Sequence, residues 1–271
     1  MSPSRNDPAA PYRISREPYY VPAADEVELF SAAYEKRIPV MLTGPTGCGK
    51  TRFVEAMAHR LQKPLVTVSC HEDLFASDLV GRFLLIEGQT VWTDGPLARA
   101  VRMGALCYLD EIVEARKDTT VVLHPLADER RTLFIEKRGE TVKAHPDFLL
   151  VISYNPGYQS VMKDLKPSTR QRFAGISFNY PDPAKEAAIV AHEGGVDPAS
   201  AEKLVTLAGK IRNMRDVGLA EGASTRLLIH AGRLMSQGIA PKSACRAAVA
   251  GPLSDEPGLL ATVMDLIEDI F

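Results

Sequence analysis

The sequence lacks an excess of charge of either sign, because 32 lysine and arginine residues stand against 34 aspartate and glutamate residues, for a formal net charge of -2. A basic surplus would favour nucleic acid, so we expect no nucleic-acid partner. The chain also lacks an apolar run near the roughly 20 residues that a membrane helix needs, and its first residues contain no apolar signal core. We therefore expect no membrane span and a cytoplasmic location.

Cysteine is also scarce, and its spacing carries no metal signature. The four residues, Cys48, Cys70, Cys107 and Cys245, show no CxxC pair, and the six histidines show no metal-ligand spacing. Such cysteines suit reduced thiols in a cytoplasmic protein.

What the chain has is enough apolar content for a sizeable core, at 45% of 271 residues. Short apolar runs alternate with stretches of helical periodicity. The runs span residues 40–43, 64–70, 105–111, 148–156 and 175–181. Strands that alternate with helices and are apolar throughout predict an α/β fold with a parallel sheet covered on both faces.

The texture changes after residues 180–183, where Ala- and Leu-rich segments are punctuated by Gly and Pro. These segments predict a small bundle of about four or five helices. We therefore expect an irregular N-terminal arm over residues 1–18, an α/β domain over 19–182 and a C-terminal helical domain over 183–271.

The strongest motif is "GPTGCGKT" at residues 44–51, between a predicted strand and a predicted helix. This is the context of a phosphate-binding loop, whose backbone N–H groups surround the phosphates of ATP. Lys50 would neutralise the β- and γ-phosphates, and Thr51 would hold Mg²⁺. The candidate nucleotide contacts are Gly44, Pro45, Thr46, Gly47, Cys48, Gly49, Lys50, Thr51 and Arg52.

Two later strands end in polar residues that extend this site. The run "CYLDE" places Asp110, a candidate Mg²⁺ ligand, and Glu111, a candidate base for the attacking water, at the carboxyl end of a strand. Asn155 closes the next strand, where its amide could orient that water or contact the γ-phosphate; an Asn before Pro is also an ordinary turn residue. Together these residues predict hydrolysis of ATP.

The motifs "GPTGCGKT", "CYLDE", "VISYNP", "STRQRF" and "GASTR", in this order, resemble those of the AAA+ ATPases, and within them of the MoxR branch. The longer segments "SDLVGRFLL" and "HPDFLLVISYNPGYQS" are similar to the CbbQ/NirQ/NorQ group, in particular to its Rubisco-activating members. The resemblance covers about residues 15–271. It implies a P-loop NTPase domain with a C-terminal helical lid, and a homo-hexamer with ATP between protomers.

The resemblance also implies roles for three arginines. Arg170 and Arg172 lie where the family has its trans-acting arginine finger, and we favour Arg172. Their alternative reading is a solvated basic turn. Arg226 matches the family's sensor-2 arginine, which senses the γ-phosphate from the lid.

Two predicted hairpins, over residues 80–97 and 130–145, match the family's pore-facing segments. Leu84, Leu85 and Phe134 are thus candidate pore contacts. The competing interpretation is that these apolar residues pack a core face.

The resemblance leaves the client open. One reading is a motor that, with a von Willebrand factor A-domain adaptor, activates inhibited Rubisco; another is the maturation or activation of nitric oxide reductase with a similar adaptor. From the residues alone, a third class remains, a nucleotide-dependent binding switch with little turnover. Glu111 argues against the switch, since a switch needs no strong base.

Overall fold

The computed structural model describes residues 7–156, 165–214, 219 and 221–271, and it divides into two units. The first unit contains Ala24–Thr43 and Lys50–Ser177 together with the chain up to Pro18. The second contains Tyr19–Ala23, Gly44–Gly49 and Phe178–Phe271. The glycine-rich loop thus groups with the helical part of the chain, although the strand before it and the helix after it belong to the first unit.

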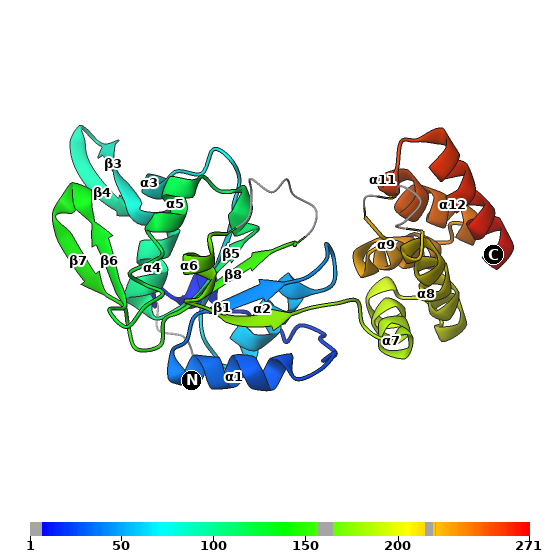
Figure 1. The fold of residues 1–271 in the computed structure, drawn as a ribbon, viewed down its shortest axis with the longest axis horizontal. Coiled ribbons are helices and arrows are strands. Elements are labelled where there is room, and N and C mark those ends of the chain that lie inside the picture. Colours follow the sequence, from blue (N-terminus) through cyan, green and yellow to red (C-terminus); the bar gives the residue numbers. More distant parts are fainter. Residues whose placement is uncertain (1–6, 157–164, 215–218, 220) are drawn as a thin grey trace. The chain divides into compact units, whose positions relative to one another are not determined.

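A five-stranded parallel sheet forms the centre of the first unit (Figure 1). Its order is β2 (Leu65–Ser69), β5 (Leu106–Asp110), β8 (Leu149–Tyr154), β1 (Val40–Thr43) and β9 (Ala174–Ser177). Four of these strands lie within the apolar runs that predicted them, and β9 begins one residue before its run and overlaps it. The α/β class with a parallel sheet is confirmed.

Alternate residues of each strand point to opposite faces of this sheet, and helices pack on both faces. On one side Leu109 and Ile152 join a core cluster with Leu97 of α4 (Pro96–Met103). On α1 (Glu26–Lys36) and α2 (Lys50–Arg60), Phe30 and Phe53 are fully buried and meet edge to face, with ring centroids 5.3 Å apart.

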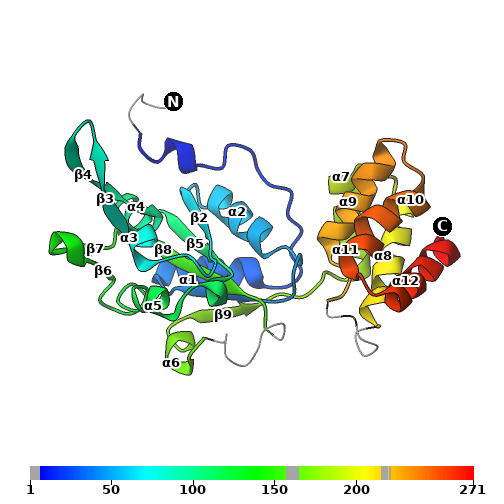
Figure 2. The same cartoon turned by 90° about the horizontal axis from the view of Figure 1, so that it is seen from above.

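Two antiparallel hairpins extend the first unit beyond the sheet: β3 (Gly81–Ile86) with β4 (Gln89–Asp94), and β6 (Thr132–Ile135) with β7 (Glu140–Lys143). They lie at the same end of the unit in two views (Figures 1 and 2). Short helices complete the unit: α3 (Ala76–Val80), α5 (Lys117–Val121) and α6 (Pro167–Arg170).

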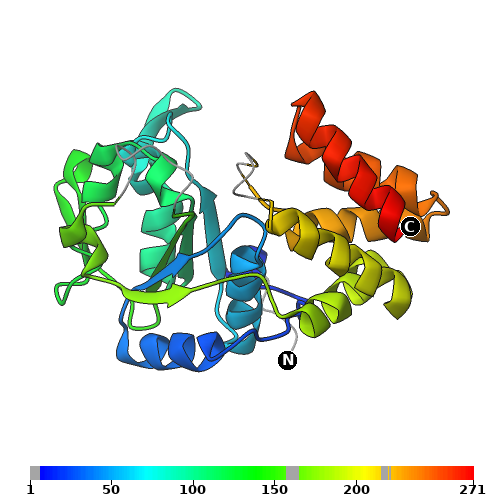
Figure 3. The same cartoon turned by 45° about the vertical axis from the view of Figure 1, so that its right-hand side comes forward.

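The second unit is a helical bundle with its own core (Figure 3). Its helices are α7 (Pro183–Gly194), α8 (Pro198–Arg212), α9 (Thr225–Ser236), α10 (Pro241–Cys245), α11 (Gly251–Leu253) and α12 (Pro257–Ile270). Helices α7 and α9 cross closely at two glycines, since a Cβ added at Gly194 would lie 3.2 Å from the Cα of Gly232. A π-helical turn, Arg246–Ala250, joins α10 to α11.

Candidate nucleotide-binding site

The glycine-rich loop joins β1 to α2 with a backbone that larger residues do not fit. Gly44 has a φ of 152°, and a Cβ there would come within 2.5 Å of the carbonyl oxygen of Phe178. Gly49 has a φ of 103°, also in the region that favours glycine. Helix α2 begins directly afterwards at Lys50. Loop N–H groups followed by a helix N-terminus suit the binding of an anion.

Three of the predicted site residues meet beside the carboxyl ends of adjacent strands. Lys50, although only 8% exposed, donates through Nζ to Oδ1 of Asn155 at 2.6 Å. Asn155 in turn donates through Nδ2 to Oε1 of Glu111 at 3.2 Å. The parallel pairing of β5 with β8 aligns these strand ends. Sequence reasoning placed the residues at matching strand ends, and the structure links them side chain to side chain.

Glu111 has an unusual backbone conformation for a residue that is not glycine. Its φ and ψ are 55° and 48°, in the left-handed region, and a 3-10 turn over Ile112–Glu114 follows it. Its N–H donates to the hydroxyl of Ser153 at 3.2 Å. The strained turn leaves the Glu111 side chain exposed beyond the strand end, while its backbone is held from β8.

Two buried hydroxyl groups, of Tyr108 and Ser153, support the acidic pair and were missed by sequence reasoning. The Tyr108 hydroxyl lies 2.7 Å from Oδ1 of Asp110, and the Ser153 hydroxyl donates to the same oxygen at 2.5 Å. Burial, followed by the charge of Asp110, raises the pKa of Tyr108, so it stays a protonated donor. The available signal was their position: each stands two residues before a site residue and so points to the same side of its strand.

A further bond links Thr51 of α2 to Asp110 of β5 at this site. The Thr51 hydroxyl donates to Oδ2 of Asp110 at 3.4 Å. A carboxylate beside a hydroxyl fits Mg²⁺, which is usually held by one or two protein oxygens together with water and substrate phosphates. Within the part of the chain that the structure describes, no group of three or more His, Cys, Asp and Glu could form a metal cage.

The remaining residues of the motif contact other residues of their own unit. Thr46 donates through Oγ1 to Oε1 of Glu221 at 2.9 Å, and Tyr180 donates its hydroxyl to the Thr46 carbonyl at 3.3 Å. Arg52 lies 3.6 Å from Glu55 along α2. The side chain of Cys48 is buried, as are those of the three other cysteines, and none of the four forms a disulfide.

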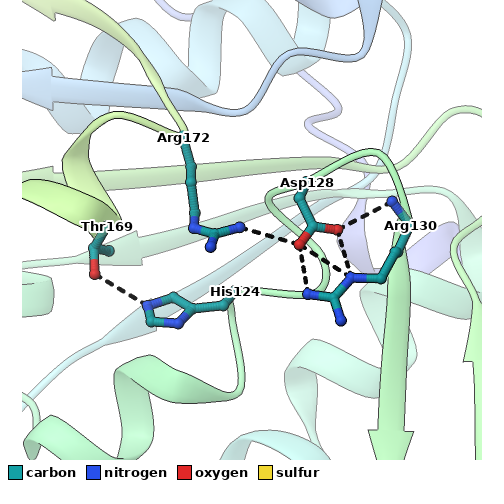
Figure 4. Close-up of polar contacts among 5 residues, drawn as sticks. All are labelled: His124, Asp128, Arg130, Thr169 and Arg172. Carbon is teal, nitrogen blue, oxygen red and sulfur yellow. Dashed lines mark hydrogen bonds and ion pairs between the residues drawn. The ribbon is translucent and has the colours of Figure 1, made fainter.

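The two candidate finger arginines differ in their surroundings. Arg170, at the end of α6, is exposed. Arg172 is half-buried and donates through Nη1 to Oδ2 of Asp128 at 3.0 Å (Figure 4). Sequence reasoning gave no sign of this contact, because the partners lie 44 residues apart.

Comparison with known proteins covers both units. Residues 39–173 match the AAA domain family (dynein-related subfamily), and residues 186–270 match the CbbQ/NirQ/NorQ C-terminal family. The chain is 59% identical to protein CbbQ of Hydrogenophilus thermoluteolus over 96% of this chain and 97% of that protein. The chain belongs to the CbbQ/NirQ/NorQ family of AAA ATPases.

Two further comparisons place this family member. Protein NorQ of Paracoccus denitrificans is 56% identical over 94% of each chain. The structure of a Thermotoga maritima RuvB mutant has a TM-score of 0.57 at 16% identity, covering 94% of this chain and 73% of that one, which shows a shared fold. Membership of the CbbQ/NirQ/NorQ family indicates ATPase chemistry and nucleotide binding in general.

The C-terminal region of this CbbQ/NirQ/NorQ member carries Arg226, the second residue of α9, with an exposed side chain. The first residue of this helix is held by α7: Thr225 donates to Oε1 of the buried Glu186 at 2.6 Å. Arg212 binds both oxygens of Glu186, at 2.7 and 2.8 Å. A Cβ added at Gly47 would lie 3.3 Å from the Cβ of Arg226, so within the second unit this arginine begins beside the loop.

The hairpins of this CbbQ/NirQ/NorQ chain present the candidate pore residues. Leu85 is 77% exposed and Phe134 47% exposed, while Leu84 is half-buried. Arg102 joins the two hairpins, since it contacts Asp94 of β4 at 3.0 Å and Glu140 of β7 at 2.7 Å. Leu85 and Phe134 therefore do not fill a core within the described chain.

No helix in the described ranges is long and apolar enough to cross a bilayer.

Proposed function

We propose that this chain is an ATP-hydrolysing motor in which Lys50, Asn155 and Glu111 act on one triphosphate. The observation that supports this most is their unbroken chain of hydrogen bonds, 2.6 and 3.2 Å long. Lys50 binds the β- and γ-phosphates, Glu111 polarises the attacking water, and Asn155 holds the two apart and orients the water. Thr51 and Asp110 would hold Mg²⁺, which neutralises phosphate charge when bound.

The motor is proposed to work as a homo-hexamer with the site shared between subunits. An arginine supplied in trans stabilises charge on the leaving phosphates. Arg172 is favoured for this role and Arg170 is the alternative. Arg226 is proposed to contact the γ-phosphate from the helical unit. The proposed domain limits remain 1–18, 19–182 and 183–271, with the last acting as a lid.

The proposed client is inhibited Rubisco, freed of tight-binding sugar phosphates with the help of a von Willebrand factor A-domain adaptor in the cytoplasm. The 59% identity to a CbbQ protein supports this reading. The 56% identity to NorQ supports the alternative, maturation or activation of nitric oxide reductase. Exposed Leu85 and Phe134 on adjacent hairpins supply an apolar surface that could grip either client.

A binding switch with little turnover is the competing class. A switch must release its state slowly, and it gains nothing from a carboxylate held in a strained turn beside the phosphate-binding lysine. Here Glu111 has a φ of 55° and is tied to Lys50 through Asn155, which favours hydrolysis.

The deciding experiment measures ATP hydrolysis by the purified chain alone, with a von Willebrand factor A-domain adaptor of the proposed kind, and with adaptor plus client. Rubisco inhibited by a sugar phosphate and inactive nitric oxide reductase are compared in parallel. We expect adaptor-dependent ATP turnover and recovery of Rubisco activity. Recovery of the reductase alone would select the alternative client, and ATP binding without turnover would select the switch.

A further inference from the structure

The segment that carries Arg172 is fastened at two points to a second segment of the same unit. Thr169, which is buried, pairs through Oγ1 with Nε2 of His124 at 3.0 Å. Arg172 pairs through Nη1 with Oδ2 of Asp128 at 3.0 Å. His124 and Asp128 are four residues apart, and Figure 4 shows both facing the arginine-bearing segment.

Asp128 is itself bound by Arg130. The Arg130 guanidinium donates to both carboxylate oxygens, with Nε at 3.0 Å from Oδ1 and Nη2 at 2.6 Å from Oδ2, and the Arg130 backbone N–H adds a bond of 3.0 Å to Oδ1. These bonds lower the pKa of Asp128 to about 2. The partner of Arg172 is therefore a carboxylate that stays ionised at neutral pH and is already bound on both oxygens.

Arg172 is not used up by this contact. Its Nε is buried and has no hydrogen-bond partner among the described residues, and a third of the side chain, 33%, is exposed. Asp128 meets two arginines, so the group keeps a net charge of +1. His124 adds no charge at neutral pH, because burial, then Arg172 and Lys166, lower its pKa. A net positive cluster with an unsatisfied donor retains attraction for a phosphate.

We propose that Asp128 is a positioning residue for Arg172, which it orders within its own subunit before that arginine meets the neighbouring subunit's ATP. This inference rests on the proposed function, in which Arg172 acts in trans. The long arginine side chain loses conformational entropy when it is held in one rotamer. If Asp128 already holds Arg172, that entropy is lost before ATP reacts. Such ordering raises the rate of the chemical step more than the affinity for ATP.

Asp128→Asn keeps the size of the side chain and removes its charge. We expect kcat for ATP to fall about ten-fold while the KM stays within two-fold, because misplacing a transition-state contact affects the rate. Asp128→Glu should regain part of the loss. Asp147→Asn is the matched control, since Asp147 forms a 2.6 Å ion pair with Lys63 elsewhere in the unit, and its kcat should not change. An unchanged or raised kcat in Asp128→Asn would overturn the proposal, a rise meaning that Asp128 restrains Arg172.

Mixed rings then test whether Asp128 acts through Arg172. Asp128→Asn subunits mixed with Lys50→Ala subunits should regain activity, because some interfaces pair an intact loop with an intact Asp128 and Arg172. Asp128→Asn mixed with Arg172→Ala should regain none, since both changes damage the same side of the interface. Recovery in this second mixture would show that Asp128 serves another site and would refute the proposal.

The control mixture is Arg172→Ala with Lys50→Ala. If verified mixed rings of that pair stay inactive, the trans role of Arg172 in the proposed function is wrong. If they regain activity but the two Asp128→Asn mixtures do not give the results expected above, only the positioning role of Asp128 is wrong. Subunit exchange and ring size are checked in every arm. If Asp128→Asn subunits do not assemble, Arg130→Gln replaces them, because it removes the charged partner of the same carboxylate. The same mixtures should then give the same pattern of recovery, and the opposite pattern would overturn the proposal.

Discussion

The strand ends and the two hairpins of the first unit differ in whether their candidate functional side chains have partners within the chain. At the strand ends, Lys50 bonds Asn155 and Asn155 bonds Glu111, so each polar group already has a partner. On the hairpins, Leu85 is 77% exposed and Phe134 is 47% exposed. The difference indicates that the strand ends are preorganised for chemistry. The hairpins instead present apolar side chains that can bind a surface from outside the described chain.

The largest effect is expected from Lys50→Ala. Loss of the cation removes the main neutralising charge on the triphosphate, and nucleotide binding should fall below detection. Titration with a fluorescent ATP analogue measures this, with Lys63→Ala, at a half-buried lysine paired to Asp147, as the control that binds normally. Retained affinity would show that the strand ends do not form the phosphate site.

Glu111→Gln should separate binding from hydrolysis. Glutamine can keep the bond to Asn155 but cannot polarise water, so ATP should bind normally while turnover falls by about 10² to 10³-fold. Equilibrium binding and phosphate release are measured on the same preparation. Wild-type turnover would remove Glu111 from the role of base.

Leu85→Glu tests the hairpin side of the comparison. A charge on a residue that is 77% exposed should leave the fold and ATP hydrolysis within about two-fold of wild type, while client activation falls about ten-fold or more. Leu29→Glu on α1, at 46% exposure, is the matched control and should activate the client normally. Loss of structure in circular dichroism would instead support the interpretation that Leu85 packs a core.

The smallest effect concerns pH. The folded state lowers the pKa of His124 from its ordinary 6.5, so the unfolded chain binds the proton more readily. The free energy of unfolding should therefore decrease as pH falls from about 7.5 through 6.5 toward the lower folded value, and then level off. His124→Gln should flatten this part of the curve in denaturant titrations. An unchanged slope would contradict burial of a neutral imidazole.

The predictable part of the site follows from the parallel sheet. Once β1, β5 and β8 are recognised as neighbours, the residues after them must meet, which brought Lys50, Glu111 and Asn155 together in advance. The supporting contacts could not be foreseen in the same way. Ser153 reaches Asp110 across 43 residues and Arg172 reaches Asp128 across 44, and side-chain pairs at such separation leave no local pattern.

The hairpins show a second limit of sequence reasoning. Alternating apolar residues such as Leu84 and Leu85 are equally compatible with a core face and an outer surface, because periodicity states only that two sides differ. The exposure of Leu85 at 77%, against a half-buried Leu84, depends on what packs beneath each hairpin. That packing comes from α3 and α4, which no pattern within the hairpin describes.

The left-handed backbone at Glu111 sets stability against activity at one position. An L-residue in that conformation costs roughly 1–2 kcal/mol relative to glycine, which adopts it freely. A library randomised at this codon and sorted on thermal unfolding alone should therefore enrich glycine, whereas one sorted on ATP turnover should return glutamate. If both selections returned the same residue, the strain would be too small to matter. Selection for robustness would by itself erode this site, and glutamate persists here only while hydrolysis is under selection.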